Sequence, residues 1–278
     1  MFLIRVLTGL CLIALFLGAI LTDILAGLSY PAGIVGTLLI AAAAHEFYAM
    51  VRTAGGAPFV LPGVLAAAVA FNVPLLSEHF VWLNGSDGVL WVLAFAAFVG
   101  LGLRFRDSKP NALGDAAVTV FGAAYIGVFG SFIVAIHTLD QGAKLVLFFV
   151  AVSKAADIGG YLSGKFFGRH KLSPAISPNK TIEGSLGGMA LSLAAAFGFR
   201  AAMPSLALPA AWTLLFAVVV NATSQFGDLA ESMLKRSCGV KDSAVVLPKV
   251  CGALDLIDSI LLSAPAAYYL IALLRLAD

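Results

Sequence analysis

A succession of apolar segments, each about as long as the hydrocarbon core of a bilayer is thick, constrains this chain more than any other feature. A transmembrane helix needs about 20 consecutive apolar residues. Hydrophobic residues make up 61% of the 278 residues and charged residues only 12%, whereas a soluble domain is usually about half apolar and a quarter charged. The sequence therefore predicts an all-α integral membrane protein of about nine transmembrane helices. Their centres lie in residues 6–27, 31–51, 58–77, 88–103, 112–135, 143–164, 185–203, 209–227 and 257–275.

Lysine and arginine are distributed unevenly between the segments that connect these helices. If the N-terminus is cytoplasmic, the cytoplasmic segments hold 13 of the 17 lysines and arginines, and the opposite loops near 28–30, 78–87 and 136–142 hold none. Such an asymmetry is what the positive-inside rule requires. It predicts a multi-pass protein of the cell inner (cytoplasmic) membrane, with its N-terminus and its long polar segments on the cytoplasmic side, where a site built from those segments would lie. The cytoplasmic segments are then residues 1–5, 52–57, 104–111, 165–184 and 228–256.

The chain shows no internal repeat, which predicts one polytopic membrane domain over residues 1–278. Residues 1–140 would form an N-terminal helical part, and residues 141–278, which hold the long polar segments, the catalytic part. No basic cluster is interleaved with aromatic residues, so nucleic acid is not an expected partner.

The first polar segment, GKFFGRHKLSPAISPNKTIEGS, covers residues 164–185 and contains one acid, Glu183. Within it, Ser177–Thr181 is predicted to be a compact turn of hydrogen-bond donors before a helix, and helix N-termini favour anions. Asn179, Lys180 and Thr181 are therefore candidates for binding phosphate. The alternative is a solvated loop that merely obeys the positive-inside rule.

The second polar segment, GDLAESMLKRSCGVKD, covers residues 227–242. On a helix Asp228, Glu231 and Lys235 share one face. Asp255 and Asp258 stand three residues apart where the last apolar segment begins. Ionised carboxylates at a membrane boundary are costly unless they are paired, hydrated or bound to metal. They suit Mg²⁺, which uses one or two protein carboxylates and fills its shell with phosphate and water. An ion-pair network without chemistry is equally compatible with the spacing.

Two further acids lie in apolar surroundings. Asp157 follows Lys154 by three residues, and the two could neutralise each other, although intramembrane ionisable residues are functional candidates by default. Glu46, in AAAAHEFYAM, is expected to extend to the inner membrane interface.

The stretches KAADIGGYLSGKFFGRHKLSPAISPNKTIEG and QFGDLAESMLKRSCGVKDS resemble the phosphatidate cytidylyltransferases, or CDP-diacylglycerol synthases. The signature of that family runs Ser-x-x-Lys-Arg, four residues, Lys-Asp, then Pro-x-His-Gly-Gly-x-x-Asp-Arg-x-Asp. This chain departs from it where Val250-Cys251-Gly252 replaces His-Gly-Gly and where Leu256 replaces Arg. The positions that match are Ser232, Lys235, Arg236, Lys241, Asp242, Pro248, Asp255 and Asp258.

The resemblance implies a reaction of CTP with phosphatidate, within the lipid bilayer, that gives CDP-diacylglycerol and pyrophosphate. It also suggests a homodimer. Asp228 and Asp255 would bind Mg²⁺ in a site of one or two cations. The triphosphate and the lipid phosphate would be held by Lys180, Lys235, Arg236 and Lys241. Supporting roles in holding the substrates, the basic residues and the metal shell would fall to Asp157, Asn179, Thr181, Glu183, Ser232, Asp242 and Asp258.

Three hypotheses remain open from the sequence. An active phosphatidate cytidylyltransferase is favoured by the paired carboxylates. A divergent paralogue, with weak activity or another phospholipid-like acceptor, is favoured by the missing His and Arg at Val250 and Leu256. A transporter or a non-catalytic scaffold is the third.

The predicted sidedness can be tested with single cysteines. Ser108→Cys and Ser173→Cys should be shielded from impermeant thiol reagents in intact cells, and Asn84→Cys should be labelled, because the positive-inside rule places the first two positions in the cytoplasm. All three should react after permeabilisation. Labelling at 173 but not at 84 in intact cells would reverse the orientation.

Overall fold

The computed structural model describes residues 14–16, 18–25, 31–77, 85–104, 111–174, 176–241, 243 and 252–277. These residues are almost entirely helical, and each of the nine apolar segments carries a helix. Within these residues, six helices are long and apolar enough to cross a membrane, and the shorter apolar helices are Ala14–Leu25, Val60–Leu76 and Gly88–Gly102. The all-α membrane class is therefore confirmed, and the protein is a multi-pass membrane protein. The number of spanning helices stays a prediction.

The chain divides into two compact units. The first contains Met1–Thr138 and Ser237–Ile257, and the second contains Leu139–Arg236 and Asp258–Asp278. The last helix, α10 (Ala253–Ala277), contributes its first turn to the first unit and the remainder to the second. The predicted single domain, with a division at residue 140, stays a prediction.

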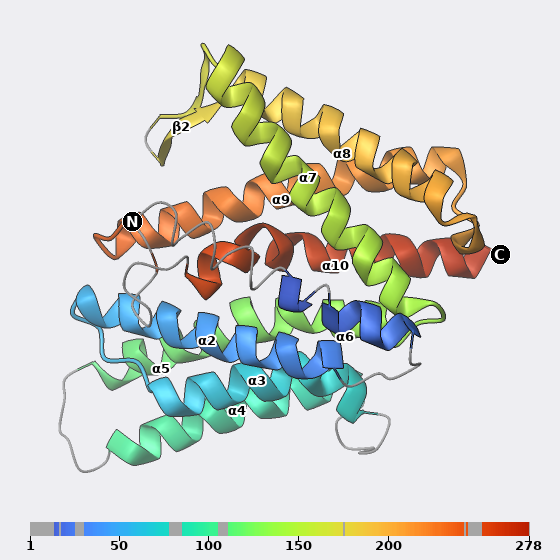
Figure 1. Ribbon diagram of the computed structural model, residues 1–278. Coiled ribbons are helices and arrows are strands. Elements are labelled where there is room, and N and C mark those ends of the chain that lie inside the picture. Colours follow the sequence, from blue (N-terminus) through green and yellow to red (C-terminus); the bar gives the residue numbers. More distant parts are fainter. Residues whose placement is uncertain are drawn as a thin grey trace. The chain divides into compact units, whose positions relative to one another are not determined.

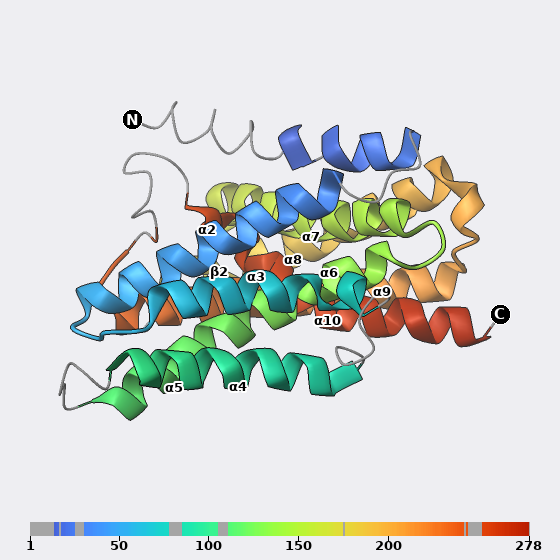
Figure 2. The ribbon, with the colours of Figure 1, turned by 90° about the horizontal axis from the view of Figure 1, so that it is seen from below.

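In the first unit α3 lies between α2 and α4 (Figures 1 and 2). Tyr48 of α2 donates a hydrogen bond of 2.7 Å to the Thr119 carbonyl, and a Cβ at Gly63 of α3 would lie 2.5 Å from its hydroxyl. The missing side chain at Gly63 thus makes room for a buried aromatic residue that joins three helices. The elements of this unit are α2 (Pro31–Thr53), α3 (Val60–Leu76), α4 (Gly85–Arg104), α5 (Ala112–Gly122), η2 (Ala123–Val128) and α6 (Phe129–His137).

The second unit is built on three helices that precede α10, with a β-hairpin between the first two (Figure 1). The hairpin is antiparallel, with Lys171 opposite Thr181 and Ser173 opposite Ser177. The prediction of a compact turn over Ser177–Thr181 is wrong in this respect, because this segment is a strand that pairs with its neighbour before the next helix begins. The elements are α7 (Gly142–Phe167), β1 (Lys171–Ser173), β2 (Ser177–Thr181), α8 (Ile182–Ala202), η3 (Pro204–Leu206) and α9 (Ala210–Ser237).

Glycines allow the backbones of α7 and α8 to come into direct contact. A Cβ at Gly159 would lie 2.6 Å from the Gly187 carbonyl oxygen and 3.0 Å from the Gly188 Cα. A Cβ at Gly188 would lie 2.8 Å from the Ala156 carbonyl oxygen. Small residues of this kind are how membrane helices gain packing energy, since lipid offers no hydrophobic driving force between them. The crossing of α7 and α8 therefore depends on glycine.

We predict that Gly159→Ala destabilises the protein by about 1–3 kcal/mol, because the methyl group meets backbone atoms that cannot rotate away. The matched control is Gly198→Ala on α8, where a Cβ meets nothing within 4 Å and should gain about 0.5–1 kcal/mol of helix propensity. Thermal unfolding of the purified proteins in detergent compares the two. Equal midpoints for both variants would contradict the close-packed crossing.

Candidate functional site

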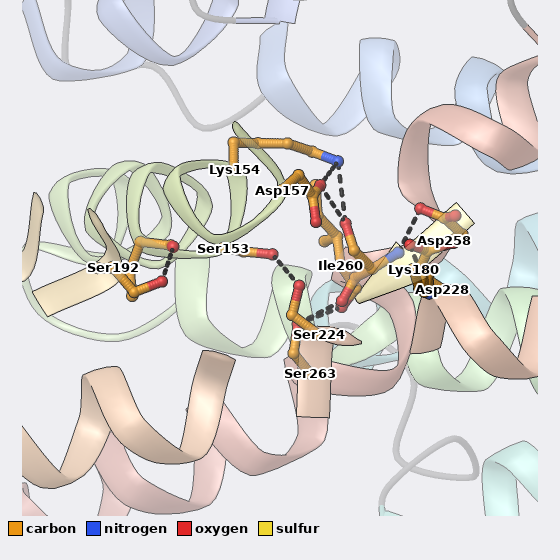
Figure 3. Close-up of polar contacts among 12 residues, drawn as sticks. Ser153, Lys154, Asp157, Lys180, Ser192, Ser224, Asp228, Asp258, Ile260 and Ser263 are labelled. Carbon is orange, nitrogen blue, oxygen red and sulfur yellow. Dashed lines mark hydrogen bonds and ion pairs between the residues drawn. The ribbon is translucent and has the colours of Figure 1, made fainter. Parts of the chain in front are cut away.

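Six polar side chains gather in the second unit, and we call them the polar cluster. They come from four elements that are distant in sequence, and five of the six side chains are labelled in Figure 3. The members are Lys154 and Asp157 of α7, Lys180 of β2, Asp228 of α9, and Asp258 and Ser259 of α10.

At one end of the polar cluster, Lys154, Asp157 and Ser259 bond to one another. The Lys154 ammonium lies 2.9 Å from Asp157 Oδ2 and donates to Ser259 Oγ at 3.0 Å, and Ser259 Oγ in turn donates to Asp157 Oδ2 at 2.9 Å. Ser259 is fully buried. The pairing of Lys154 with Asp157, which the sequence suggested, is present. Ser259 was missed, because nothing local distinguishes a serine that bonds to another helix.

At the other end, the Lys180 ammonium lies 2.7 Å from Asp228 Oδ2. The exposed fractions of these side chains are 21% and 39%, so both can be reached by solvent or substrate. The pair brings together the two polar segments of the sequence, one on the hairpin and one on α9. The structure thus places two of the predicted site residues in direct contact.

The position of Lys180 is held by the residues that follow it. Thr181 caps α8, since its Oγ1 accepts the Gly184 N–H at 3.1 Å. Glu183, in the first turn of α8, accepts the Arg169 N–H at 3.0 Å and pairs with His170 Nδ1 at 2.6 Å. These contacts fasten both ends of the hairpin to one helix N-terminus, where a hydroxyl and a carboxylate satisfy N–H groups.

Asp228 and Asp258 lie beside Lys180 in Figure 3. They meet where α9 and α10 cross, because a Cβ at Gly227 would lie only 2.7 Å from the Asp258 carbonyl oxygen. The Asp258 side chain is buried and feels the charges of Lys154, Asp157 and Asp228. The polar cluster contains three carboxylates and two ammonium groups, so with every group ionised it carries an excess of negative charge. Such an excess favours the binding of a further cation.

Further hydrogen bonds outside the polar cluster join α7 to α9 and α8 to α7. Ser153 of α7 and Ser224 of α9 lie 3.2 Å apart, and Ser192 of α8 donates to the Val152 carbonyl at 3.0 Å (Figure 3). Hydrogen bonds between membrane helices typically contribute about 0.6–2 kcal/mol each. They hold the frame that carries the polar cluster.

Other predicted residues of the second unit lie outside the polar cluster. The buried Glu231 pairs with Lys235 at 2.5 Å, one turn along α9. Ser232 is buried, whereas Arg236 and Asn179 are exposed.

Except for Asp258, the signature residues beyond α9 belong to the first unit. Lys241 is exposed there, and Asp255 and Leu256 are half-buried in the first turn of α10. Asp242 and Val250 lie outside the described residues.

Glu46 is buried within the protein and does not extend into solvent. Its side chain is 3% exposed, and Oε2 accepts the Leu254 N–H of α10 at 3.0 Å. Its partner is the N-terminus of another helix, which offers N–H groups that need an acceptor, and its place at the inner membrane interface stays a prediction.

The donor chemistry of the polar cluster fits Mg²⁺. In the described part of the chain, no three His, Cys, Asp or Glu side chains are gathered as metal ligands. Mg²⁺ does not need such a set, since one or two carboxylates suffice when phosphate and water complete its shell. The polar cluster offers the carboxylate oxygen that Mg²⁺ prefers, for example on the half-exposed Asp228.

Comparisons with known proteins show the family to which the chain belongs. The sequence model of the cytidylyltransferase family matches residues 3–274. The chain is 33% identical over 214 residues to a phosphatidate cytidylyltransferase of Bacillus subtilis (strain 168), which covers 77% of this chain and 79% of the relative. It is 31% identical over 261 residues to a phosphatidate cytidylyltransferase of Chlamydia trachomatis serovar D, and the aligned residues cover 86% of this chain and 84% of that relative. A Mycobacterium leprae (strain TN) relative of the same name is 33% identical over 254 residues, which covers 84% and 77%.

The family match extends over both compact units, and the similarity to these relatives covers at least three quarters of the chain. Together with the paired lysines and aspartates of the polar cluster, it identifies the chain as a member of the cytidylyltransferase family.

Proposed function

We propose that this protein is a phosphatidate cytidylyltransferase, which transfers CMP from CTP to phosphatidate and forms CDP-diacylglycerol and pyrophosphate in phospholipid biosynthesis. The observation that carries this proposal is the similarity to phosphatidate cytidylyltransferases over most of the chain. The helical membrane fold supports it, because phosphatidate is a lipid whose acyl chains stay in the bilayer while its phosphate reacts at the surface.

The reaction makes particular demands on the protein. An oxygen of the phosphatidate phosphate attacks the α-phosphorus of CTP, and the bond from that phosphorus to the bridging oxygen of the β-phosphate breaks, so that pyrophosphate leaves with the electron pair. The second pKa of a phosphomonoester is about 6, so the attacking group is largely a dianion and needs no strong base. The protein must instead bring two anions together and stabilise the charge of the leaving group.

The basic residues are suited to that task. Lys180 already forms an ion pair across two elements, and a phosphate oxygen could take the place of Asp228 at its ammonium. We assign Lys180, Lys235, Arg236 and Lys241 to the triphosphate and the lipid phosphate, with Asn179, Thr181 and Asp242 supporting substrate binding. Lys154 and Ser259 keep Asp157 neutralised and fixed within the helices.

The remaining assignments extend the sequence predictions. Asp228 and Asp255 would hold Mg²⁺, in a site of one or two cations. When bound, the ion would neutralise phosphate charge and favour departure of pyrophosphate. Asp258 and Glu183 would support the site, the first through its charge beside Asp228 and the second through the backbone of the hairpin.

The cellular setting follows from the same proposal. We place the protein in the cell inner membrane with its N-terminus in the cytoplasm, where CTP is found, and we expect a homodimer. The Lys and Arg asymmetry of the sequence supports the orientation.

A second candidate is a divergent member with weak activity or another phospholipid-like acceptor. The observation that favours it is the apolar Leu256, half-buried in the first turn of α10 beside Asp255, where the family signature has Arg. Loss of a charge-assisted contact of about 1.5–3 kcal/mol would reduce the rate roughly 10- to 100-fold if the contact is felt fully in the transition state.

Pyrophosphate release by the purified protein in mixed micelles with CTP, phosphatidate and Mg²⁺ tests the proposal. We expect release that requires both substrates and stops when the metal is chelated. Release that appears only after Leu256→Arg and Val250→His are combined would favour the second candidate, provided that stability is unchanged. Uptake of a charged solute into liposomes without pyrophosphate release would favour a transporter instead.

We further predict that Asp228→Asn lowers the rate of pyrophosphate release by roughly 100-fold or more, with little change in thermal stability, because it removes charge from the site and not packing. The matched control is Asp140→Asn, which breaks the exposed ion pair of Asp140 with Arg275, 3.5 Å long, in the same unit. The control should keep the wild-type rate. Wild-type turnover of Asp228→Asn at every Mg²⁺ concentration would exclude Asp228 as a metal ligand.

A further inference from the structure

The helix that carries Asp255 begins without a side-chain cap of its own. Gly252 directly precedes α10, and its carbonyl accepts the Leu256 N–H at 3.1 Å, which makes it the N-cap residue. The first N–H groups of any α-helix have no partner within the helix and are usually satisfied by a Ser, Thr, Asp or Asn at the N-cap. Glycine has no side chain to do so.

Glu46 of α2 supplies the missing acceptor from a distant part of the sequence. Its Oε2 accepts the Leu254 N–H at 3.0 Å. A carboxylate at this position also meets the positive end of the helix dipole, which compensates part of the cost of burying the charge. Both helix segments belong to the first unit.

The space around Gly252 explains why the cap comes from another helix. A Cβ at this residue would lie 2.3 Å from Ser243 Oγ, 3.0 Å from Glu46 Oε2 and 3.0 Å from Asp255 Oδ2. A capping serine or aspartate at 252 therefore has no room. Because an oxygen of Glu46 and an oxygen of Asp255 both lie 3.0 Å from the same Cβ position, the two carboxylates are neighbours. A change in the position of Glu46 should therefore change the position of Asp255.

We infer that Glu46 is a positioning residue: it caps α10 and thereby sets the place of the Asp255 carboxylate. The inference rests on the proposed function, in which Asp255 holds Mg²⁺. It assigns to the N-terminal helices a role in the reaction, exerted through the backbone of α10 and without contact to substrate.

The test combines two variants with a control. Glu46→Ala removes the acceptor, and Glu46→Gln keeps an amide oxygen of the same reach. Asp115→Ala is the matched control, because Asp115 is a buried carboxylate of the same unit. It also accepts a backbone N–H, that of Ala57 at 2.9 Å, and Ala57 is not part of α10. Two measurements are made on the full-length protein in micelles: steady-state pyrophosphate release and hydrogen exchange of the peptide that contains residues 252–258.

We expect Glu46→Ala to lower kcat roughly 10- to 100-fold, as displacement of a reacting group by about 1 Å can do. The KM for CTP should change by less than about threefold, since CTP contacts are left in place. Exchange at the start of α10 should rise in Glu46→Ala. Glu46→Gln should recover most of both losses, and Asp115→Ala should change neither kcat nor the exchange of residues 252–258.

Four outcomes would overturn the inference. These are a kcat of Glu46→Ala within twofold of the wild type, an equal loss in Asp115→Ala, unchanged exchange of residues 252–258, and a failure of Glu46→Gln to recover activity while it recovers exchange. A wild-type protein that releases no pyrophosphate would overturn both the proposed function and the catalytic role of Glu46. If hydrogen exchange of residues 252–258 still rises in Glu46→Ala and not in Asp115→Ala, the capping of α10 by Glu46 is established all the same.

Discussion

An ionised side chain among apolar helices must find its partner within the protein, because neither lipid tails nor neighbouring aliphatic side chains can solvate it. In the second unit the Lys154 ammonium is satisfied by Asp157 and Ser259, and Lys180 is satisfied by Asp228. In the first unit Glu46 uses a backbone N–H group in place of a cation. Each solution joins elements that are distant in sequence, so the demand for neutralisation also determines which helices meet. The chemistry proposed for this protein uses the same groups that the fold needs.

Such contacts require backbones to come close, and glycine provides the room. At the crossing of α7 and α8, a methyl group on Gly159 would meet backbone atoms, and at the crossing of α9 and α10 one on Gly227 would meet the Asp258 carbonyl. Without those approaches Asp228 would not lie beside Asp258, and the hairpin that carries Lys180 would lose the frame on which Thr181 and Glu183 fasten it. The packing of small residues thus fixes the distances between the charged groups, on which their interactions depend.

Local patterns predicted much of this arrangement. The helices follow from long apolar runs, and the contact of Lys154 with Asp157 follows from their spacing of three residues within one helix. The segment Ser177–Thr181 is predicted as a compact turn of hydrogen-bond donors, yet it pairs as a strand with Lys171–Ser173. Propensity is a weak guide for so short a segment, where a few interstrand hydrogen bonds outweigh it.

By itself the sequence determined the membrane class, the helical content and the residue types available for chemistry, because hydropathy and family signatures act over residues close in the chain. Only the tertiary structure decided that Ser259 completes the bonds of Lys154 and Asp157, that Lys180 pairs with Asp228, and that Glu46 caps the helix of Asp255. These contacts join residues between 48 and 208 positions apart, the extremes being Lys180 with Asp228 and Glu46 with Leu254. No periodicity encodes such pairs. They form where helix packing brings a buried charge within hydrogen-bonding distance of a group that can satisfy it, and that is a property of the folded chain.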